Sequence, residues 1–260
     1  MASGRFFRTI RITILLLILF FVGMNTWLTQ LRSTDWDESL WVVVYPVNGD
    51  NSPVTQKYIG TLSRDTFRSI ESFLDDEANR YGMAISDPVT VRLAEQVADR
   101  PPLPPINGST LSVMLWSLKL RYWAFRNDNF DGPKPDVQMF VVYHDPDTHN
   151  TLRHSLGIQK GMIGVVNAYA GRSLAQRNNV VIAHEFLHTL GASDKYDRAN
   201  NQPIYPDGYA EPDRTPLHPQ RKAEIMAGRI PLSDHQAVMP KSFAASSIGA
   251  KTAHEIRWIN

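Results

Sequence analysis

The chain has 260 residues, of which 43% are hydrophobic, 20% charged and 10% aromatic. This ordinary globular composition excludes a disordered, collagen-like or low-complexity chain, and the length suffices for one large domain or two small ones. The absence of cysteine excludes disulfides, thiolate metal sites and a cysteine nucleophile. A tightly bound metal ion must therefore use His, Asp or Glu.

The basic residues are unevenly distributed along the chain. Residues 1–32 contain four arginines and no acidic residue, which leaves 23 basic and 26 acidic residues in the remainder. A mildly acidic body lacks the basic face that nucleic-acid binding requires, so we expect no nucleic-acid partner.

The N-terminal region has the pattern of a membrane-spanning segment. Residues 12–28 (ITILLLILFFVGMNTWL) carry no charge, and the apolar Ile10 and Leu31 extend the run towards the length that a spanning helix needs. The stronger positive cluster lies before this run and consists of Arg5, Arg8 and Arg11. Because such clusters stay in the cytoplasm, the body is expected on the other side of the membrane.

We therefore expect a single-pass protein of the cell membrane with a periplasmic or extracellular domain. In chain order, the expected parts are a cytoplasmic basic tail (1–11), a transmembrane signal anchor (12–31), a connector (32–39) and a catalytic domain (40–260). A cleaved signal peptide is the main alternative, although no small-x-small cleavage site follows the apolar run. A buried core helix is the other alternative, but this run has no polar face.

Hydrophobic periodicity predicts alternating strands and helices in the body. Runs that are β-branched, aromatic or alternating predict strands over 40–47, 89–97, 137–143, 152–159 and 162–168. Apolar residues at helical spacing predict helices over 62–81, 109–125, 178–190 and 246–256. Residues 195–221 are expected to form a loop. The early alternation fits an α/β or α+β domain, and we expect the α+β class, with a twisted mixed sheet packed on helices.

The most informative segment is 180–197, VVIAHEFLHTLGASDKYD. His184 and His188 are four residues apart, which places both imidazoles on one face of a helix, able to bind one metal ion. Glu185 faces the same side and can deprotonate a water molecule at the metal. Gly191 can end the helix in a left-handed conformation and turn Asp194 back as the third ligand. Asp197 is the competing ligand.

A solvated helix face without a metal is the alternative interpretation of this pattern. The rest of the helix is almost entirely apolar, so a His-Glu-His face without a ligand would leave costly unsatisfied polar groups. We therefore expect one catalytic zinc ion, bound by His184, His188 and Asp194, with Glu185 as the base.

The segment HEFLHTLGASD resembles the metzincin zinc-peptidase signature HExxHxxGxx(H/D). Asp194 occupies the place usually held by a third histidine, as in the snapalysins; the aspzincins also use aspartate, but at a longer spacing. Metzincins have a methionine turn downstream, and residues 224–228 (EIMAG) resemble it, although Met226 also fits an ordinary core position. The resemblance implies a metzincin-like fold and zinc-dependent hydrolysis of peptide bonds.

The same resemblance gives a role to the strands before the helix. Metzincins pair an extended substrate with an edge strand along the cleft, and residues 156–166 (LGIQKGMIGVV) are the candidate here. An ordinary edge hairpin fits these residues equally well. The expected partner is therefore a peptide or protein substrate, in addition to the membrane through residues 12–31.

Three weaker patterns carry alternative interpretations. One loop contains a cluster of residues that could bind a second, structural metal ion or simply be solvated polar side chains: His144, Asp145, Asp147, His149 and His154. Calcium binding fits a second set only loosely, because the spacing matches no EF-hand: Asp197, Asp207, Glu211 and Asp213. Three tyrosines could donate a hydrogen bond to the oxyanion that forms in the transition state, or could pack at the surface: Tyr196, Tyr205 and Tyr209.

The function expected from the sequence is that of a membrane-anchored zinc metallopeptidase acting outside the cytoplasm. Two alternatives remain open. A non-catalytic, zinc-stabilised binding module would have no need of Glu185 as a base. A zinc-dependent hydrolase of a non-peptide envelope amide would use the same chemistry at the metal.

Overall fold

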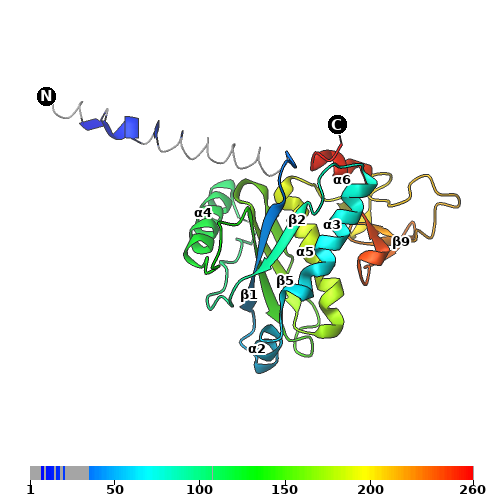
Figure 1. Cartoon of the computed structure of the whole chain (residues 1–260), viewed down its shortest axis with the longest axis horizontal. Helices are drawn as coiled ribbons and strands as arrows, with labels where there is room; N and C mark the ends of the chain where they lie inside the picture. The colour runs from blue at the N-terminus through cyan, green and yellow to red at the C-terminus, as the bar shows by residue number, and fades with distance from the viewer. Residues whose placement is uncertain are drawn as a thin grey trace.

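The computed structural model describes residues 7–8, 10–14, 16–17, 20, 35–106 and 108–259. Its centre is a five-stranded sheet with the strand order β2-β1-β3-β5-β4 (Figure 1). The strands are β1 (Leu40–Asn48), β2 (Val89–Leu93), β3 (Val137–His144), β4 (Leu156–Ile158) and β5 (Ile163–Tyr169). Four of them run parallel, and the edge strand β4 is antiparallel to β5.

Helices cover both faces of this sheet. One face packs against α2 (Pro53–Ile59), α3 (Arg68–Arg80), α5 (Ala175–Leu190) and the C-terminal α6 (Ala250–Glu255). The other face packs against α4 (Thr110–Arg126) through Leu120 and Ala124. Figure 1 shows α4 on one side of the sheet and α3 with α5 on the other. The sheet is therefore the middle layer of three.

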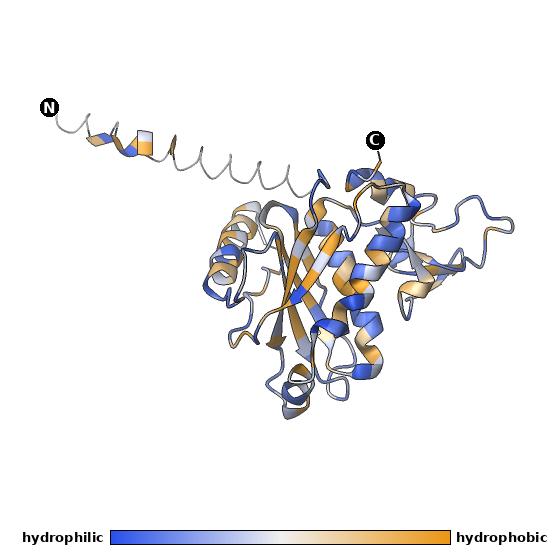
Figure 2. Ribbon diagram, viewed as in Figure 1, coloured by the Kyte–Doolittle hydropathy of each residue, from blue (hydrophilic) through white to orange (hydrophobic). Residues whose placement is uncertain are grey.

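The apolar run of β1 follows from its position in the middle of this sandwich. Val42 and Val44 point into the core under α3 and α5, whereas Val43 and Tyr45 point into the core under α4. A strand buried on both faces has no polar positions, which explains the continuous hydrophobic sequence. The strands predicted over 40–47 and 137–143 are confirmed, and the sheet stands out as hydrophobic in Figure 2.

The connections between the strands correct the predicted α+β class. β1 reaches β2 through α2 and α3, and β2 reaches β3 through α4. Parallel neighbours need such crossovers, because a tight hairpin can join only antiparallel strands. The molecule is therefore a mixed α/β structure, with strands and helices alternating through its first half.

The prediction of a membrane anchor is also corrected. Among the described residues, no helix is both long enough and apolar enough to cross a membrane, which takes about 20 consecutive apolar residues. The transmembrane helix expected over 12–31, and the cell-membrane location that depended on it, are therefore not supported. Most of the basic tail (1–11) and of the anchor (12–31), and residues 32–34 of the connector (32–39), lie outside the described residues.

The chain after α5 forms short two-stranded ladders. These are β6 (Tyr196–Asp197) with β7 (Gln202–Pro203), β9 (Ile230–Ser233) with β10 (Gln236–Val238), and β8 (Ala223–Glu224) with β11 (Ser246–Ser247). The helix predicted over 246–256 is shorter than expected. Its first two residues pair with β8, and Gly249 is the N-cap of α6.

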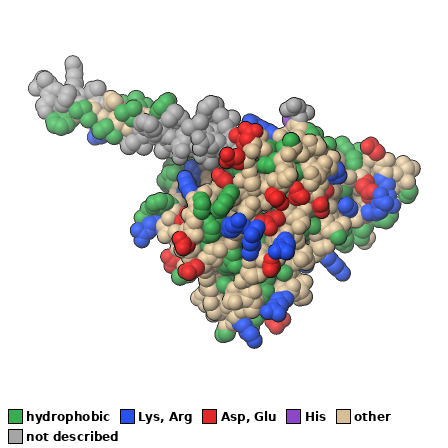
Figure 3. Space-filling model, viewed as in Figure 1, with side chains coloured by type: hydrophobic (Ala, Val, Ile, Leu, Met, Phe, Trp, Pro, Cys, Tyr) green, Lys and Arg blue, Asp and Glu red, His purple; other side chains and the backbone are tan. Residues whose placement is uncertain are grey.

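Helix α4 leaves much of its apolar surface uncovered. Seven of its large apolar side chains are exposed: Leu111, Val113, Met114, Leu115, Leu118, Tyr122 and Phe125. Figure 3, which has the same view as Figure 1, shows apolar side chains at the left of the molecule, where α4 lies. Acidic and basic side chains are interspersed over the rest of the viewed face. The hydrophobic pattern that predicted the helix over 109–125 therefore reflects only partial burial.

Candidate metal centre

Helix α5 (Ala175–Leu190) carries His184 and His188, two of the three candidate ligands, on its last turns. It ends at Gly191, which adopts a left-handed conformation with φ of 108°. The N–H groups of Gly191 and Ala192 bond back to carbonyls of the last turn, at His188 and Leu187 respectively. A side chain at residue 191 would also collide with Gln159, since a Cβ there would lie 2.5 Å from its Nε2. The predicted turn at Gly191 is confirmed, and it reverses the chain towards the helix face.

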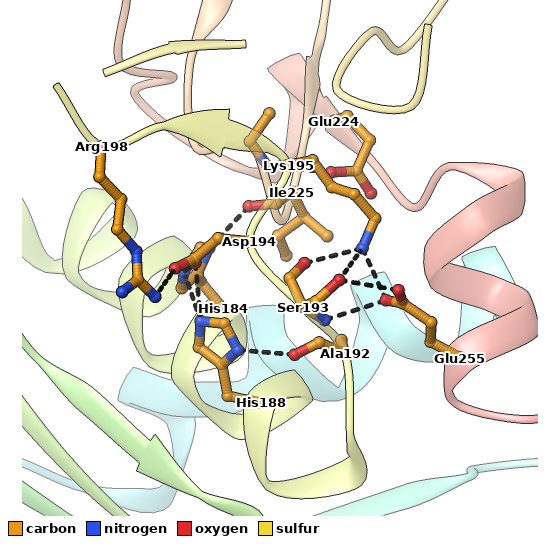
Figure 4. A network of polar contacts seen from close by, with 11 residues as sticks. His184, His188, Ala192, Ser193, Asp194, Lys195, Arg198, Glu224, Ile225 and Glu255 are labelled. Atoms are coloured by element: carbon orange, nitrogen blue, oxygen red, sulfur yellow. Dashed lines mark hydrogen bonds and ion pairs between the residues drawn. The ribbon is translucent and has the colours of Figure 1, made fainter. Parts of the chain in front are cut away.

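His184, His188 and Asp194 each bring one ligand atom to a single point (Figure 4). The Nε2 atoms of the two histidines are 3.1 Å apart. Asp194 Oδ1 lies 3.0 Å from His188 Nε2 and 3.5 Å from His184 Nε2. A tetrahedral centre with bonds of about 2.0–2.1 Å places neighbouring ligand atoms about 3.3 Å apart, so these distances fit a zinc ion with little rearrangement.

Backbone carbonyls hold the proton of each imidazole on the nitrogen that points away from this centre. His184 Nδ1 donates to the carbonyl of Ile225 at 2.8 Å, and His188 Nδ1 donates to that of Ala192 at 2.7 Å. The two Nε2 atoms therefore carry free electron pairs when the imidazoles are neutral. They face Asp194 Oδ1, a buried atom without a hydrogen-bond partner among the described residues. Three facing electron pairs repel one another unless a cation lies between them.

The local charges favour a cation at this point. Burial alone would lower the pKa of His184, but the neighbouring carboxylates of Asp194 and Glu185 outweigh it and raise that pKa. Burial would likewise raise the pKa of Asp194, but its contacts with His184, His188 and the exposed Arg198 hold it well below its usual range. The raised pKa of His184 reflects the negative charges beside it, and the lowered pKa of Asp194 keeps that carboxylate ionised, so the centre presents negative charge to a divalent metal ion.

Glu185 lies beside the ligands, and its side chain forms no hydrogen bond with the part of the chain that the structure describes. Its residue is 6% exposed, and its Oε2 is buried without a hydrogen-bond partner among the described residues. Burial raises the pKa of this carboxyl group, which makes it a stronger base than a solvated glutamate. An orphaned carboxylate is costly to bury, so this glutamate points to chemistry rather than to packing.

The turn at 224–228 supports the first ligand. Glu224 accepts hydrogen bonds from the N–H groups of Ala227 and Gly249 and from the hydroxyl of Thr252, so it ties this turn to the start of α6. The turn presents the Ile225 carbonyl to His184, while Met226 is fully buried in the core. The similarity of this segment to a methionine turn thus coincides with a contact to a candidate ligand.

A second network, drawn in Figure 4, fixes the chain on either side of Asp194. Lys195 is 4% exposed, and its ammonium group pairs with Glu255 Oε2 at 2.6 Å. The same carboxylate accepts hydrogen bonds from the N–H and hydroxyl groups of Ser193. No sequence pattern pointed to Lys195 or Glu255, because 60 residues separate them and their pairing depends on the tertiary fold.

We predict that Lys195→Met lowers both stability and zinc affinity. Glu255 would remain without its buried partner, and breaking such a pair costs about 3 kcal/mol. The segment that carries Asp194 would lose its anchor, and the loss of an outer-shell partner weakens metal binding by roughly 10–100-fold. Thermal unfolding and zinc titration against a competing chelator measure the two effects. Lys222→Met, at an exposed lysine, is the control and should change neither.

The other residues considered from sequence lie in different environments. Asp197 is exposed, and its carboxylate caps the turn at Ala199, away from the three ligands. The four acidic residues considered as a loose calcium set do not form a ligand group among the described residues, and one of them, Glu211, pairs with Arg221 and Arg214. Of the tyrosines, Tyr205 is exposed and Tyr209 contacts His218, whereas Tyr196 lines the site.

Two adjoining cavities of about 430 and 480 Å³ meet at the candidate centre. Both are lined by His184, Glu185, Tyr196 and residues 154–155. The larger cavity is lined by all three candidate ligands and also by Leu156 and Gly157 of β4. Gly157 is required there, because a Cβ would lie 2.3 Å from the Glu185 carbonyl of α5. The edge strand therefore packs directly against the helix that carries the site.

Comparisons with known proteins add little to this geometry. No protein-family model matches the chain, and no curated protein matches it significantly. Among solved structures, a chain from the "Structure of a chaperone-substrate complex" is similar, with 11% sequence identity and a TM-score of 0.38. The alignment covers 85% of this chain and 34% of that one, so this chain spans about a third of its neighbour's length. A likeness this weak carries no argument about fold or function.

Proposed function

We propose that this protein is a zinc-dependent peptidase that hydrolyses peptide bonds with Glu185 as its general base. The observation that carries the proposal is the convergence of His184, His188 and Asp194 beside an orphaned, buried carboxylate. A structural zinc site uses four protein ligands, whereas a hydrolytic site keeps one position open. Three ligands and a neighbouring base fit the second kind. The similarity of HEFLHTLGASD to the metzincin signature supports the same proposal.

Glu185 and Tyr196 would have separate roles in hydrolysis. When bound, a zinc ion would polarise the scissile carbonyl and lower the pKa of a water molecule. Glu185 takes the proton of that water on its buried carboxylate and later delivers it to the leaving amine. Tyr196, which lines both cavities, is the tyrosine that we assign as hydrogen-bond donor to the developing oxyanion. Burial and the charge of Asp194 raise the pKa of Tyr196, so its hydroxyl keeps its proton.

The edge strand β4 and the two cavities form a candidate binding site for the substrate. β4 pairs with β5 on one side only, so its outer edge offers backbone groups to an extended peptide. Its residues Leu156 and Gly157 line the cavity that contains the ligands. A peptide bound along this edge would bring its backbone past Glu185, with one side chain entering the adjoining cavity of about 430 Å³.

The two rival functions differ in what they require of Glu185. A non-catalytic binding module has no use for an unpartnered carboxylate next to its metal. A hydrolase of a non-peptide amide would need the same base, so only the substrate separates it from a peptidase. Cleavage of an unstructured protein, compared with release from isolated cell-envelope material, distinguishes these two hydrolases.

We predict that removal of the metal abolishes hydrolysis and that zinc restores it. The full chain, freed of metal by a chelator and dialysed, should no longer cleave unstructured protein, because no other described group can activate water beside Glu185. Addition of zinc should return the activity, and calcium should not, since it prefers six to eight oxygen ligands. Elemental analysis should confirm that the metal has been removed. If the metal-free protein then cleaves as fast as before, the proposal is contradicted.

A further inference from the structure

A second group of metal-ligand side chains lies outside the candidate metal centre. Asp50, His144 and His149 each bring one ligand atom within 4.8 Å of the other two. Asp50 follows β1, His144 is the last residue of β3, and His149 lies in the loop after β3. The sequence indicated His144 and His149 as part of a loop cluster, but Asp50 comes from a different connection. Parallel β1 and β3 end side by side, which brings these residues together.

The carboxylate of Asp50 is held in position by the backbone. Its Oδ1 accepts a hydrogen bond from the N–H of Ser52 at 2.9 Å, and its Oδ2 accepts one from Asp145 at 2.6 Å. Oδ2 also lies 3.7 Å from Nδ1 of His149. These hydrogen bonds fix the carboxylate beside His149, where its remaining electron pairs can bind a cation.

The imidazole of His144 presents an unused ligand atom. Its Nε2 lies 3.2 Å from the amide oxygen of Asn167, whose own amide nitrogen donates to the His154 carbonyl. This arrangement places the imidazole proton on Nε2 and leaves the electron pair on Nδ1. Nδ1 is buried and has no hydrogen-bond partner among the described residues. Gly49 allows this close packing, since a Cβ there would lie 2.5 Å from the ring.

We propose that Asp50, His144 and His149 form a second metal site that binds a divalent transition-metal ion of the zinc type. Two imidazoles and one carboxylate suit zinc or cobalt, whereas calcium and magnesium require sites built from oxygen. His149 is 38% exposed on its loop, so its side chain can close on an ion. The fourth position is open to water.

The site would stabilise one wall of the substrate cavity. An ion bound there joins the turn after β1 to the loop at 145–155, and residues 150–155 of that loop line the cavity of about 430 Å³. The Tyr169 hydroxyl, which donates to the Asn150 carbonyl, is a second tie on the same loop. The site shares no ligand with His184, His188 or Asp194, so it holds whether or not the protein is a peptidase.

Cobalt titration of the full chain against a competing chelator tests the proposal. The Glu185→Gln background prevents self-digestion and should bind two equivalents. His149→Ala should bind one, whereas His235→Ala, at an exposed histidine outside both groups, should still bind two. The double variant His184→Ala with His188→Ala should keep the second equivalent alone. No bound cobalt in the folded double variant, or the same number of equivalents in folded His149→Ala as in the background protein, would overturn the proposal.

A rescue variant distinguishes a ligand from a merely structural histidine. His149→Cys should regain the second equivalent and show a thiolate-to-cobalt charge-transfer band, which is assignable because the chain has no other cysteine. The band is measured on the cysteine variant itself, so it does not depend on whether His149→Ala keeps its fold. Absence of the band in a folded Cys variant contradicts ligation at residue 149.

Tryptic cleavage after the exposed Arg153 reports on the loop itself. Zinc at 100 times its dissociation constant should slow this cleavage about 100-fold if opening of the loop requires release of the ion. His149→Ala should show no protection at the same zinc concentration. Equal cleavage rates with and without zinc in the background protein would contradict the proposed link between the metal and the loop.

Discussion

Glu185→Gln is expected to retain zinc at His184, His188 and Asp194 while hydrolysis falls by about 10²–10⁴-fold. The substitution preserves the size of the side chain and touches none of the three ligands. It removes the carboxylate that accepts the proton of the attacking water, and an amide cannot replace it. Peptide hydrolysis under steady-state conditions, with zinc content measured on the same preparation, gives both quantities.

The loss should appear in kcat rather than in KM. Glu185 acts on the reacting water, so its removal affects the transition state more than the binding of the peptide. Glu95→Gln is the matched control, because Glu95 is an exposed glutamate far along the sequence from the site. Turnover that is unchanged in Glu185→Gln would remove this residue from the mechanism and, with it, most of the case for a peptidase.

Local sequence patterns predicted the parts of the fold that depend on neighbouring residues. The buried runs of β1 and β3 and the apolar helix α5 follow from hydrophobic periodicity alone. Gly191 was correctly predicted as the left-handed end of α5, because glycine adopts the left-handed conformation of a helix end at little cost. The spacing of the ligands then required only that the chain turn back at this point.

The predictions that failed depended on contacts between distant segments. The α+β class was wrong because hydrophobic patterns do not reveal whether neighbouring strands run parallel. The strand predicted over 152–159 is reduced to β4, because only Leu156–Ile158 pairs with β5. The predicted membrane anchor rested on composition alone, and no described helix supports it.

The same limit applies to the residues that hold the candidate ligands in position. The carbonyl of Ile225 holds His184 across 41 residues, and Glu255 reaches Lys195 across 60. Backbone carbonyls have no sequence signature, and a buried Lys–Glu pair looks like two surface residues until the fold is known. Asp50 shows this most clearly, since no local pattern relates it to the two histidines beside which it lies.

The third ligand provides the sharpest test of the candidate centre. Asp194→Ala should weaken zinc binding by more than the roughly 10–100-fold that loss of an outer-shell partner costs, because it removes a directly bound oxygen. Asp197→Ala should weaken it by less than about 10-fold, since that exposed carboxylate only caps the turn at Ala199. Zinc titration against a competing chelator compares the two variants.

Substitution of the same position by histidine refines the test. Asp194→His offers a nitrogen ligand that also suits tetrahedral zinc, although the longer side chain displaces the ion and breaks the ion pair with Arg198. A carboxylate lowers the net charge of the centre by one relative to imidazole, so the histidine variant should bind a more acidic water. Its rate profile should therefore shift to lower pH. If Asp194→Ala binds zinc as tightly as the parent while Asp197→Ala does not, the assignment of Asp194 is wrong, and the spacing argument that led to it fails as well.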